Sequence, residues 1–459
     1  MHNMTATVAA VSTPSGKGGV ALIRVSGRDA FVIADRVFLP RCGKALSALP
    51  PRTQHFGDIL SDGELVDEGL ATRFPAPHSF TGEDTVEICC HGGILVTRCV
   101  LEGLFTAGAV PAAPGEFTRR AFLNGKMSLT DAEALGLLLD AGSRDQLRLS
   151  GAAARGRLSD AIRELCSSLT EILGATFARI DYPDEDLGEF SDEECAARLS
   201  ALADRTERLI RTYRTGRAVC EGIRTVLVGK PNAGKSSLYN LLAGEDAAIV
   251  TAVAGTTRDV LERTVPLGRV LLRLADTAGV RETDDPVEAI GVARAKACLA
   301  DADLILAVFD SSRPWETEDE ALVTLIKDAG IPAIALLNKA DMPIVIDKNR
   351  VYDAFSHVLS LSCTTGDTEE LRALVDRMFT DGDVVIGQDA VVSSARQYAT
   401  LLRVRDALRE AVAAYAAGLP ADAASSLAER ALNALGELCG TTASEAVTAE
   451  IFSKFCVGK

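Results

Sequence analysis

Gly-Lys-Pro-Asn-Ala-Gly-Lys-Ser, residues 229–236, is the stretch that decides how this chain folds, because it fits the phosphate-loop pattern G-x-x-x-x-G-K-[ST]. An apolar run at 225–228 precedes it, and a helical pattern begins at Ser237. In a strand–loop–helix arrangement, backbone N–H groups and the helix N-terminus surround a phosphate group. Lys235 can then reach the β- and γ-phosphates, and the Ser236 hydroxyl can ligate Mg²⁺. The segment therefore predicts a nucleotide-binding α/β domain.

Two later segments supply what the phosphate end of such a site requires. Residues 255–259, Gly-Thr-Thr-Arg-Asp, form a polar stretch in which Thr257 is a candidate second hydroxyl ligand for Mg²⁺. Residues 276–279, Asp-Thr-Ala-Gly, follow an alternating strand pattern at 270–274. They bring a carboxylate near the metal and a glycine N–H near the γ-phosphate. Either segment alone reads equally well as an ordinary polar loop.

Two more segments point to guanine as the base. Asn-Lys-Ala-Asp, residues 338–341, ends the apolar strand 334–337, and the Asp341 carboxylate can accept both N1–H and N2–H₂ of guanine. Adenine has no such pair of donors. Ser362-Cys363 follows the strand pattern at 358–361 and can offer a backbone N–H to the guanine oxygen. Four segments in this order, each after a strand, favour one nucleotide site over unrelated loops.

Strand and helix patterns alternate from 223 to 378, which predicts a doubly wound parallel sheet with its ligand at the strand ends. This region resembles a Ras-like GTPase domain. Ras-type GTPases carry Gln directly after Asp-x-x-Gly to orient the attacking water, but this chain has Val280, which cannot hydrogen-bond. Glu282 is the candidate to orient the water instead, and Arg281 is a candidate charge clamp. Two solvated loop charges are the alternative.

The composition bounds the remaining possibilities. At 459 residues the chain holds about three domains. A net charge of −16 argues against broad coating of nucleic acid, although it leaves room for a local basic patch. No apolar run approaches the ~18 residues that span a bilayer, and the N-terminus lacks the features of a signal peptide. Eleven scattered cysteines fit reduced thiols better than a disulfide framework. We expect a cytoplasmic protein without a membrane segment.

Helical patterns flank the nucleotide-binding region on both sides. Residues 1–120 mix short β-rich runs with glycine turns, an α+β pattern. Apolar residues at three- and four-residue intervals predict one long helix through 147–177 and another near 192–215. Helical patterns resume at 395–418, 427–439 and 446–455.

The nucleotide-binding domain is therefore expected to interrupt one helical domain, with joints near 216–217 and 381–383. The expected limits are an N-terminal domain at 1–122, helical parts at 123–219 and 381–459, and the GTPase domain at 220–380.

Further signatures extend the resemblance to the whole chain. They are Ser-Phe-Thr-Gly-Glu-Asp (79–84), His-Gly-Gly (91–93), Pro-Gly-Glu-Phe-Thr (114–118), Ala-Phe-Leu-Asn-Gly-Lys (121–126), Ile-Asp-Tyr-Pro (180–183), Leu-Gly-Glu (435–437) and Phe-Cys-Val-Gly-Lys (455–459). With them, the chain resembles the TrmE family of tRNA modification GTPases, also called MnmE. The resemblance implies a multidomain α+β and α/β fold: an N-terminal folate-binding aminomethyltransferase-like domain, a discontinuous helical domain and an inserted Ras-like P-loop GTPase domain.

The resemblance also implies an activity and its partners. The family forms homodimers, hydrolyses GTP with Mg²⁺ and K⁺, and joins an FAD-dependent MnmG-type partner in a heterotetramer. Together they add an aminomethyl or carboxymethylaminomethyl group to C5 of the wobble uridine, position 34, of certain tRNAs. A tetrahydrofolate derivative, in the 5,10-methylene or 5-formyl form, supplies the carbon, and FAD enters only through the partner.

Site residues carry over position by position from this resemblance. K⁺ would be bound by Asn232, Thr251, Val253 and Thr256, and Mg²⁺ by Ser236 and Thr257. The GTP contacts would be Asn232, Ala233, Gly234, Lys235, Ser236, Ser237, Thr251, Ala252, Val253, Ala254, Gly255, Thr256, Thr257, Asp276, Thr277, Ala278, Gly279, Asn338, Lys339, Asp341, Ser362 and Cys363. The folate contacts would be Arg24, Glu87, Lys126 and Lys459.

Catalytic roles are expected for Lys235, for Glu282, which matches the family's water-orienting glutamate, and for Cys456. A cysteine after an apolar Phe455 can equally be a small packing residue. Without the resemblance, Arg24 and Glu87 would read as plain strand-end charges. The competing interpretations of the whole chain are a GTP-switched RNA-binding or ribosome-assembly factor and a scaffold whose GTPase domain drives dimerisation.

Overall fold

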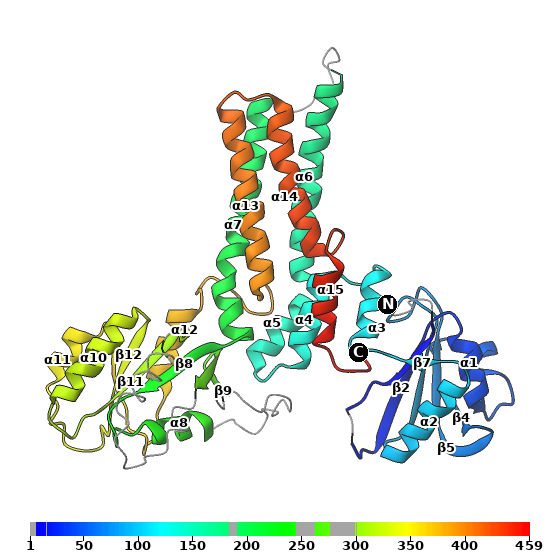
Figure 1. Ribbon diagram of the computed structural model, residues 1–459, viewed down its shortest axis with the longest axis horizontal. Coiled ribbons are helices and arrows are strands. Elements are labelled where there is room, and N and C mark those ends of the chain that lie inside the picture. The colour runs from blue at the N-terminus through cyan, green and yellow to red at the C-terminus, as the bar shows by residue number, and fades with distance from the viewer. Residues whose placement is uncertain (1–5, 15, 183–190, 245–261, 276–298, 300) are drawn as a thin grey trace. The chain divides into compact units, whose positions relative to one another are not determined.

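The computed structural model describes residues 6–14, 16–182, 191–244, 262–275, 299 and 301–459 (Figure 1). The chain divides into two compact units, each of which is described by itself. Unit 1 comprises Met1–Gly136, Ile162–Ser167 and Leu432–Lys459, and unit 2 comprises Leu137–Ala161 and Ser168–Ala431. The domain limits expected from the sequence stay predictions.

Unit 1 is built on a seven-stranded sheet with the strand order β3-β4-β5-β6-β2-β1-β7. Its strands are β1 (Val8–Val11), β2 (Val20–Ser26), β3 (Phe38–Pro40), β4 (His55–Ser61), β5 (Glu64–Phe74), β6 (Thr85–His91) and β7 (Val110–Pro111). All neighbouring strands run antiparallel except β1 and β7. The α+β character expected of the N-terminal region is confirmed.

One apolar core holds unit 1's sheet and its helices together. Helices α1 (Ala30–Val37) and α2 (Ile94–Thr106) bury Ile33, Val100 and Leu104 against the strands. A third helix, α3 (Glu116–Leu123), follows β7 and begins after Gly115, whose φ is +64°. A short 3₁₀ turn lies at Leu46–Ala48.

The C-terminal segment of the chain packs within the same unit. Val457 forms an isolated antiparallel bridge with Pro114. The N–H of Phe117 donates to the carbonyl of Lys459 at 3.0 Å, and the N–H of Gly115 donates to the carbonyl of Cys456 at 3.3 Å. Residues distant in sequence thereby meet at the start of α3.

Unit 2 contains a six-stranded sheet in the order β13-β12-β11-β8-β10-β9. Its strands are β8 (Ile223–Val228), β9 (Glu262–Leu267), β10 (Val270–Ala275), β11 (Leu304–Asp310), β12 (Ala333–Asn338) and β13 (Val358–Ser360). Five of them are parallel, but β9 pairs antiparallel with β10. The predicted parallel sheet is confirmed for these five strands, and its edge strand β9 is antiparallel because a hairpin turn at Gly268 joins it directly to β10.

Helices cover both faces of this sheet, as the doubly wound interpretation requires. They are α8 (Lys235–Gly244), α10 (Thr317–Ala329), α11 (Lys348–Ala354) and α12 (Glu369–Phe379). Successive residues of β8 enter opposite cores. Leu227 packs in one core with α8 and α12, and Val226 and Val228 pack in the other with α10 and α11. A strand buried on both faces explains the continuous apolar run before the phosphate loop.

The remaining helices form the helical part of the chain. They are α4 (Leu129–Leu139), α5 (Arg144–Ala154), α6 (Arg157–Asp181), α7 (Asp192–Cys220), α13 (Ala395–Ala416), α14 (Ala421–Cys439) and α15 (Glu445–Ser453). Helices α7 and α13 pack against each other although the whole six-stranded sheet lies between them in sequence (Figure 1). Capping boxes start both helices, at Ser191 with Glu194 and at Ser394 with Gln397.

Two expectations about helices are wrong. The single helix through 147–177 is two helices, because Gly156 adopts a φ of +93° between α5 and α6. The apolar spacing continues across the break, so it did not reveal the turn. Helix α14 begins at Ala421, directly after Pro420, and not at the expected residue 427, because its first turn, Ala-Asp-Ala-Ala, has no large apolar residue to extend the pattern.

The last turns of α7 hold the chain that returns from the sheet. Thr215 accepts a hydrogen bond from the N–H of Asp381 at 2.7 Å, and Thr212 accepts one from the N–H of Val392 at 3.0 Å. Gly216 follows Thr215, and an added Cβ there would stand 2.0 Å from the Val392 carbonyl oxygen. The joints expected near 216–217 and 381–383 therefore lie side by side.

No helix among the described residues combines the length and the apolar character needed to cross a bilayer.

The close approach at Gly216 generates a stability prediction. Gly216→Ala should lower the apparent melting temperature by several degrees, because a Cβ there must displace backbone and such overpacking costs about 1–3 kcal/mol. Gly174→Ala is the matched control, since Gly174 lies within α6 and nothing would touch its Cβ. That change should stabilise by about 0.5–1 kcal/mol. Melting is monitored by far-ultraviolet circular dichroism. Equal melting temperatures for the two variants would contradict the close backbone approach at Gly216.

Candidate functional site

The phosphate loop joins β8 to the N-terminus of α8, as the sequence pattern predicts. Two of its glycines are required by close approach. A Cβ at Gly229 would stand 2.3 Å from the Val308 carbonyl oxygen, and one at Gly234 would stand 2.0 Å from Asn338 Nδ2. Gly234 also has a φ of +101°. The loop is therefore drawn against β11 and β12, and its backbone can form a phosphate cradle.

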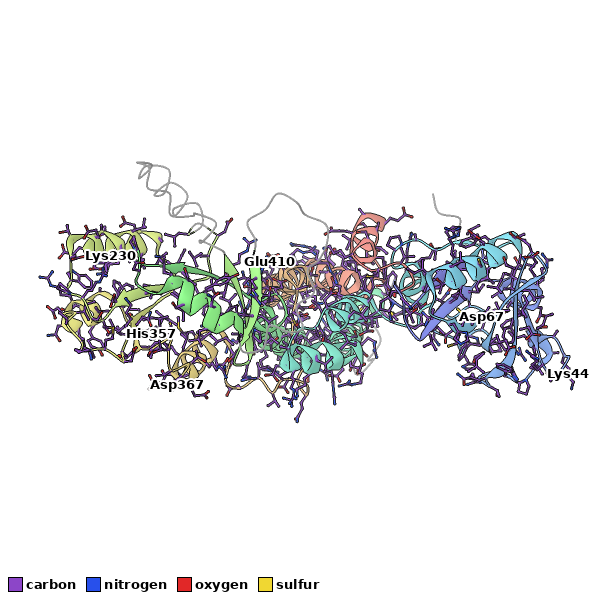
Figure 2. The ribbon with its side chains drawn as sticks, turned by 90° about the horizontal axis from the view of Figure 1, so that it is seen from below. Lys44, Asp67, Lys230, His357, Asp367 and Glu410 are labelled. Carbon is purple, nitrogen blue, oxygen red and sulfur yellow. The ribbon has the colours of Figure 1, made fainter. Side chains whose placement is uncertain are left out.

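Lysine side chains fix the shape of the loop. Lys235 Nζ donates to the carbonyls of Gly229 and Lys230, both at 2.8 Å. Lys230 Nζ pairs with Asp319 at 2.6 Å and with Glu316 at 2.8 Å, at the start of α10 (Lys230 is labelled in Figure 2). Burial opposes the charge of Lys230, but the hydrogen bonds to both carboxylates raise its pKa.

The metal-binding side of the loop is only partly described. Ser236 and Ser237 are exposed in the first turn of α8, where Ser236 is free to meet a ligand. Asn232 is also exposed and has a φ of +64°. The predicted residues that lie outside the described part are Thr251, Ala252, Val253, Ala254, Gly255, Thr256, Thr257, Asp276, Thr277, Ala278, Gly279, Val280, Arg281 and Glu282.

Asn338 links the phosphate loop to the predicted base-binding loop. Its side-chain Nδ2 donates to the Ala233 carbonyl at 2.9 Å, and its Oδ1 accepts from the N–H of Cys363 at 3.3 Å. The residue is 2% exposed. A buried amide with both ends satisfied holds the two loops at a fixed spacing. The sequence pattern identified Asn338 but not this bridging role.

Lys339, next along the chain, is held by a carboxylate beneath it. The residue has a φ of +60°, and its ammonium pairs with Asp310 at 2.6 Å. Burial raises the pKa of Asp310, but the bonds from Lys339 and Ser312 outweigh it and hold the pKa below its ordinary value.

Asp341, the residue predicted to read guanine, lies beside the second base-binding segment. Ser362 Oγ donates to its carboxylate at 2.6 Å, and this bond lowers the pKa of Asp341. An ionised carboxylate is the form that accepts two N–H donors. Strands β12 and β13 thus bring Asn338, Asp341 and Cys363 together, as the sequence predicts.

A second polar centre lies in unit 1. Arg24 and Glu87 are direct cross-strand partners on β2 and β6, and Arg24 Nη2 lies 2.8 Å from Glu87 Oε1. The guanidinium carbon also lies 4.9 Å from the centroid of the Phe80 ring and 5.4 Å from that of Phe117. Only 13% of the Arg24 side chain is exposed. A cation, a carboxylate and two aromatic faces form a built centre rather than two solvated charges.

The other predicted folate contacts lie around the same elements. Lys126 Nζ donates to the Pro77 carbonyl at 3.0 Å, close to the loop that carries Phe80. Lys459 reaches the centre through its backbone, which accepts from the N–H of Phe117. The side chain of Cys456 is exposed. The structure therefore gathers Arg24 and Glu87 directly, and Lys126 and Lys459 through neighbouring segments.

Arg120 orders the segments that carry both aromatic rings, and sequence reasoning missed it. It is 1% exposed and pairs with Glu116 at 2.8 Å and Glu83 at 3.0 Å. It also donates to the carbonyl of Ala6 at 3.0 Å. Removing one member of such a buried network costs about 3–5 kcal/mol. The rings themselves lie within the quoted signatures 79–84 and 114–118, so their positions could have been found.

Groups of three or more His, Cys, Asp or Glu side chains suited to a metal do not occur in the described part of the chain. The proposed Mg²⁺ and K⁺ ligands are of another kind, namely hydroxyl, amide and carbonyl oxygens.

The comparisons with known proteins cover nearly the whole chain. Residues 7–126 match the family described as GTP-binding protein TrmE N-terminus, and residues 129–456 match the MnmE helical domain. A tRNA modification GTPase MnmE of Geobacillus kaustophilus is 41% identical over 459 residues, which is 99% of each chain. One of Symbiobacterium thermophilum is also 41% identical, again over 99% of each chain.

Solved structures match part of the chain. The G domain of the T. maritima FeoB iron transporter is 27% identical, covering 34% of this chain and 97% of that one, with a TM-score of 0.26. Aquifex aeolicus Era bound to GDP and AlF₄⁻ is 26% identical, covering 40% and 66%, with a TM-score of 0.27.

The two family matches and the identity over the full length show the family of this chain. The chain belongs to the TrmE (MnmE) family of tRNA modification GTPases.

Proposed function

We propose that this chain hydrolyses GTP in the modification of the wobble uridine of tRNA. The observation that carries the proposal is the arrangement around Asn338, which holds a glycine-cradled phosphate loop at a fixed spacing from Asp341. A site with these two ends suits a guanine nucleoside triphosphate. Family membership then selects tRNA modification from the many processes that use such domains.

The described residues divide the binding of GTP between them. Backbone N–H groups of 232–236 and the N-terminus of α8 would hold the phosphates, with Lys235 as the neutralising cation. Asp341 would accept the guanine N1–H and N2–H₂, and Cys363 would offer its N–H to the guanine oxygen. Ser236 would contribute a hydroxyl to Mg²⁺, a metal that coordinates oxygen ligands. We assign Glu282 the orientation of water, because the usual glutamine position is Val280.

The Arg24 centre is the proposed site for the tetrahydrofolate derivative. A pterin ring is flat and carries N–H donors, so Glu87 suits its polar edge and the rings of Phe80 and Phe117 suit its faces. Arg24, Lys126 and Lys459 suit the carboxylates of a folate tail. When bound, the folate supplies the one-carbon unit, and these side chains bind and orient it.

The assembly is part of the same proposal. We infer a homodimer that joins an FAD-dependent MnmG-type partner in a heterotetramer, acting in the cytoplasm. FAD belongs to that partner.

The function is tested on wobble nucleosides of a strain that lacks the gene. We expect mass analysis to show loss of the C5 substituent at position 34, restored by the full-length chain. A chain without residues 456–459 should not restore it, because these residues include the proposed catalytic Cys456 and folate-binding Lys459. Cys456→Ser separates the thiol from the tail, since it keeps the backbone contacts. Normal nucleosides in the deletion strain, or full rescue by the truncated chain, would overturn the assignment.

Two substitutions in the nucleotide site should have opposite kinetic signatures. Glu282→Ala should keep near-normal GTP affinity and lower the hydrolysis rate by about 10²–10⁴, the usual loss for a group that positions or deprotonates a nucleophile. Asp341→Asn should instead weaken GTP binding by about 10–100-fold, because a charge-assisted hydrogen bond contributes about 1.5–3 kcal/mol. Single-turnover hydrolysis and equilibrium binding separate the effects. An unaltered hydrolysis rate for Glu282→Ala would mean that Glu282 is only a solvated loop charge.

The cation proposal is tested at Asn232. Because its φ is +64°, Asn232→Gly removes the side-chain oxygen without the strain that alanine would add. Arginine fingers, which play a comparable role, contribute about 10³–10⁵ in rate, so the wild type should hydrolyse GTP far faster in K⁺ than in Na⁺. In Asn232→Gly the two rates should become about equal. Asn240→Ala, an exposed asparagine of α8, is the control and should retain the K⁺ response.

A further inference from the structure

Helix α7 carries an arginine at every third position of its last turns. These are Arg205, Arg208, Arg211, Arg214 and Arg217, and Glu207 is the one carboxylate between the first and the last of them. The chain as a whole has a net charge of −16. The row spans thirteen residues, Arg205 to Arg217, which is about 18 Å of helix. These arginines form a local basic patch, which the net negative charge of the whole chain does not exclude.

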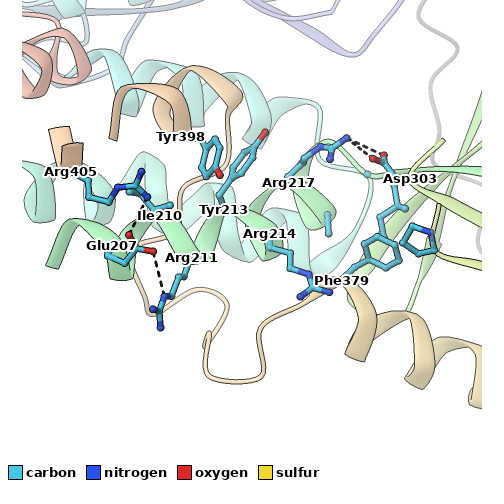
Figure 3. Close-up of a pocket in the computed structure, with 14 residues that line it drawn as sticks. Glu207, Ile210, Arg211, Tyr213, Arg214, Arg217, Asp303, Phe379, Tyr398 and Arg405 are labelled. Carbon is cyan, nitrogen blue, oxygen red and sulfur yellow. Dashed lines mark hydrogen bonds and ion pairs between the residues drawn. The ribbon is translucent and has the colours of Figure 1, made fainter. Parts of the chain in front are cut away.

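A cavity of about 620 Å³ lies along this row, between α7 and α13 and beside the start of β8 and β11 (Figure 3). Its size is that of a ligand site, which is typically ~300–1,000 Å³. Arg211, Arg214 and Arg217 of α7 and Arg405 of α13 line it, with Glu207 and Asp303 as the carboxylates. Four guanidinium groups thus face two carboxylates.

The guanidinium groups at one end share too few carboxylates to be neutralised. Glu207 lies 3.3 Å from Arg405, 3.4 Å from Arg409 and 3.8 Å from Arg211, so it is divided among three cations. Asp406 pairs with Arg405 at 2.8 Å and compensates one of them. The Arg211 side chain is 71% exposed. This end of the cavity keeps an excess of positive charge open to a ligand.

At the other end of the cavity, Arg214 and Arg217 also bond to neighbouring parts of the protein. Arg217 makes two bonds to Asp303, at 2.9 and 3.1 Å, with Glu221 at 3.8 Å as a weaker partner. Arg214 donates to the carbonyl of Met378, and no carboxylate of the described residues pairs with it. Arg214 therefore keeps its full charge at the wall of the cavity.

Two stacked tyrosines form the remaining polar wall. The rings of Tyr213 and Tyr398 lie 4.3 Å apart at an interplanar angle of 20°. Figure 3 shows them between the Arg405 and Arg217 ends. The Tyr213 hydroxyl is protonated at neutral pH like any tyrosine, and burial raises its pKa further. Aromatic faces and arginines together are the usual surface for a nucleic acid strand.

We propose that this cavity binds a phosphate of an RNA strand, and that the α7 arginines lining it, Arg211, Arg214 and Arg217, contact the backbone beside that phosphate. The proposal rests on the proposed function, in which tRNA is the substrate. Arginine suits the task because its planar fork meets phosphate oxygens in pairs. A strand of phosphates matches an extended row with an exposed rim better than a single small anion, which would need an enclosed site.

Binding of a labelled tRNA to the full-length chain, measured over a range of salt concentrations, tests the proposal. Arg211→Gln/Arg405→Gln should weaken binding by about tenfold at low salt and lower the slope of log affinity against log salt by about one to two. Arg211→Lys should retain most of the slope, because it keeps the charge. Arg198→Gln is the matched control, an arginine of the same helix outside the row, and should behave as the wild type.

The outcomes separate this proposal from the function on which it rests. If the wild type binds tRNA and the double variant has the same affinity and slope, the site is wrong but the function stands. If the deletion strain has normal wobble nucleosides and the wild type binds no tRNA, both fail. Titration with inorganic phosphate alone gives a further check: binding that depends on Arg211, with tRNA binding unchanged, would assign the cavity to a small anion. Circular dichroism melting shows whether each variant is folded.

Discussion

The arrangement of unit 2 depends on the hydrogen bonds between the last turns of helix α7 and the segment that follows the six-stranded sheet. The chain leaves α7 at Cys220 to enter the six-stranded sheet and comes back past Asp381 and Val392. An inserted domain needs its two ends close together, and here one helix holds both. Because Gly216 admits no side chain, the two connections touch through their backbones, and Arg217 adds a bond to Asp303 at the start of β11. The sheet is thereby attached to α7 through both connecting segments, the one that enters the sheet and the one that leaves it.

In unit 1, segments distant in sequence are held together by the ion pairs of one buried arginine, Arg120. Arg120 is almost fully buried, so its bonds to Glu83, Glu116 and the carbonyl of Ala6 must all form for the region to fold. These bonds fix the loop and the helix that present aromatic rings to Arg24. The C-terminal residues then pack on the same helix. A chemistry that needs both ends of the chain can therefore be assembled within one unit.

The sequence predicted most of this fold because its strongest signals are local. The phosphate loop required a strand before it and a helix after it, and the strand ends followed from apolar runs bounded by polar loops. The errors occurred where apolar spacing is uninformative: Gly156 breaks a helix without breaking the stripe, and β9 joins the sheet edge in the antiparallel sense. For the sites, the pattern named Asn338 and Arg24, but their partners depend on tertiary contacts. The bond from Asn338 to Ala233 and the rings around Arg24 join residues far apart in the chain.

The double role of Asn338 bears on how a nucleotide would depart. Its amide bonds at one end to the phosphate loop and at the other to the loop expected to hold the base. Loosening either loop removes one of the two hydrogen bonds that hold the Asn338 amide in place, which leaves the amide freer to turn away from the other loop. Release of the two ends of a nucleotide should then be cooperative, so that the lifetime of the bound state is set by one concerted opening rather than by two independent ones. A protein built in this way can change its exchange rate by acting on either loop.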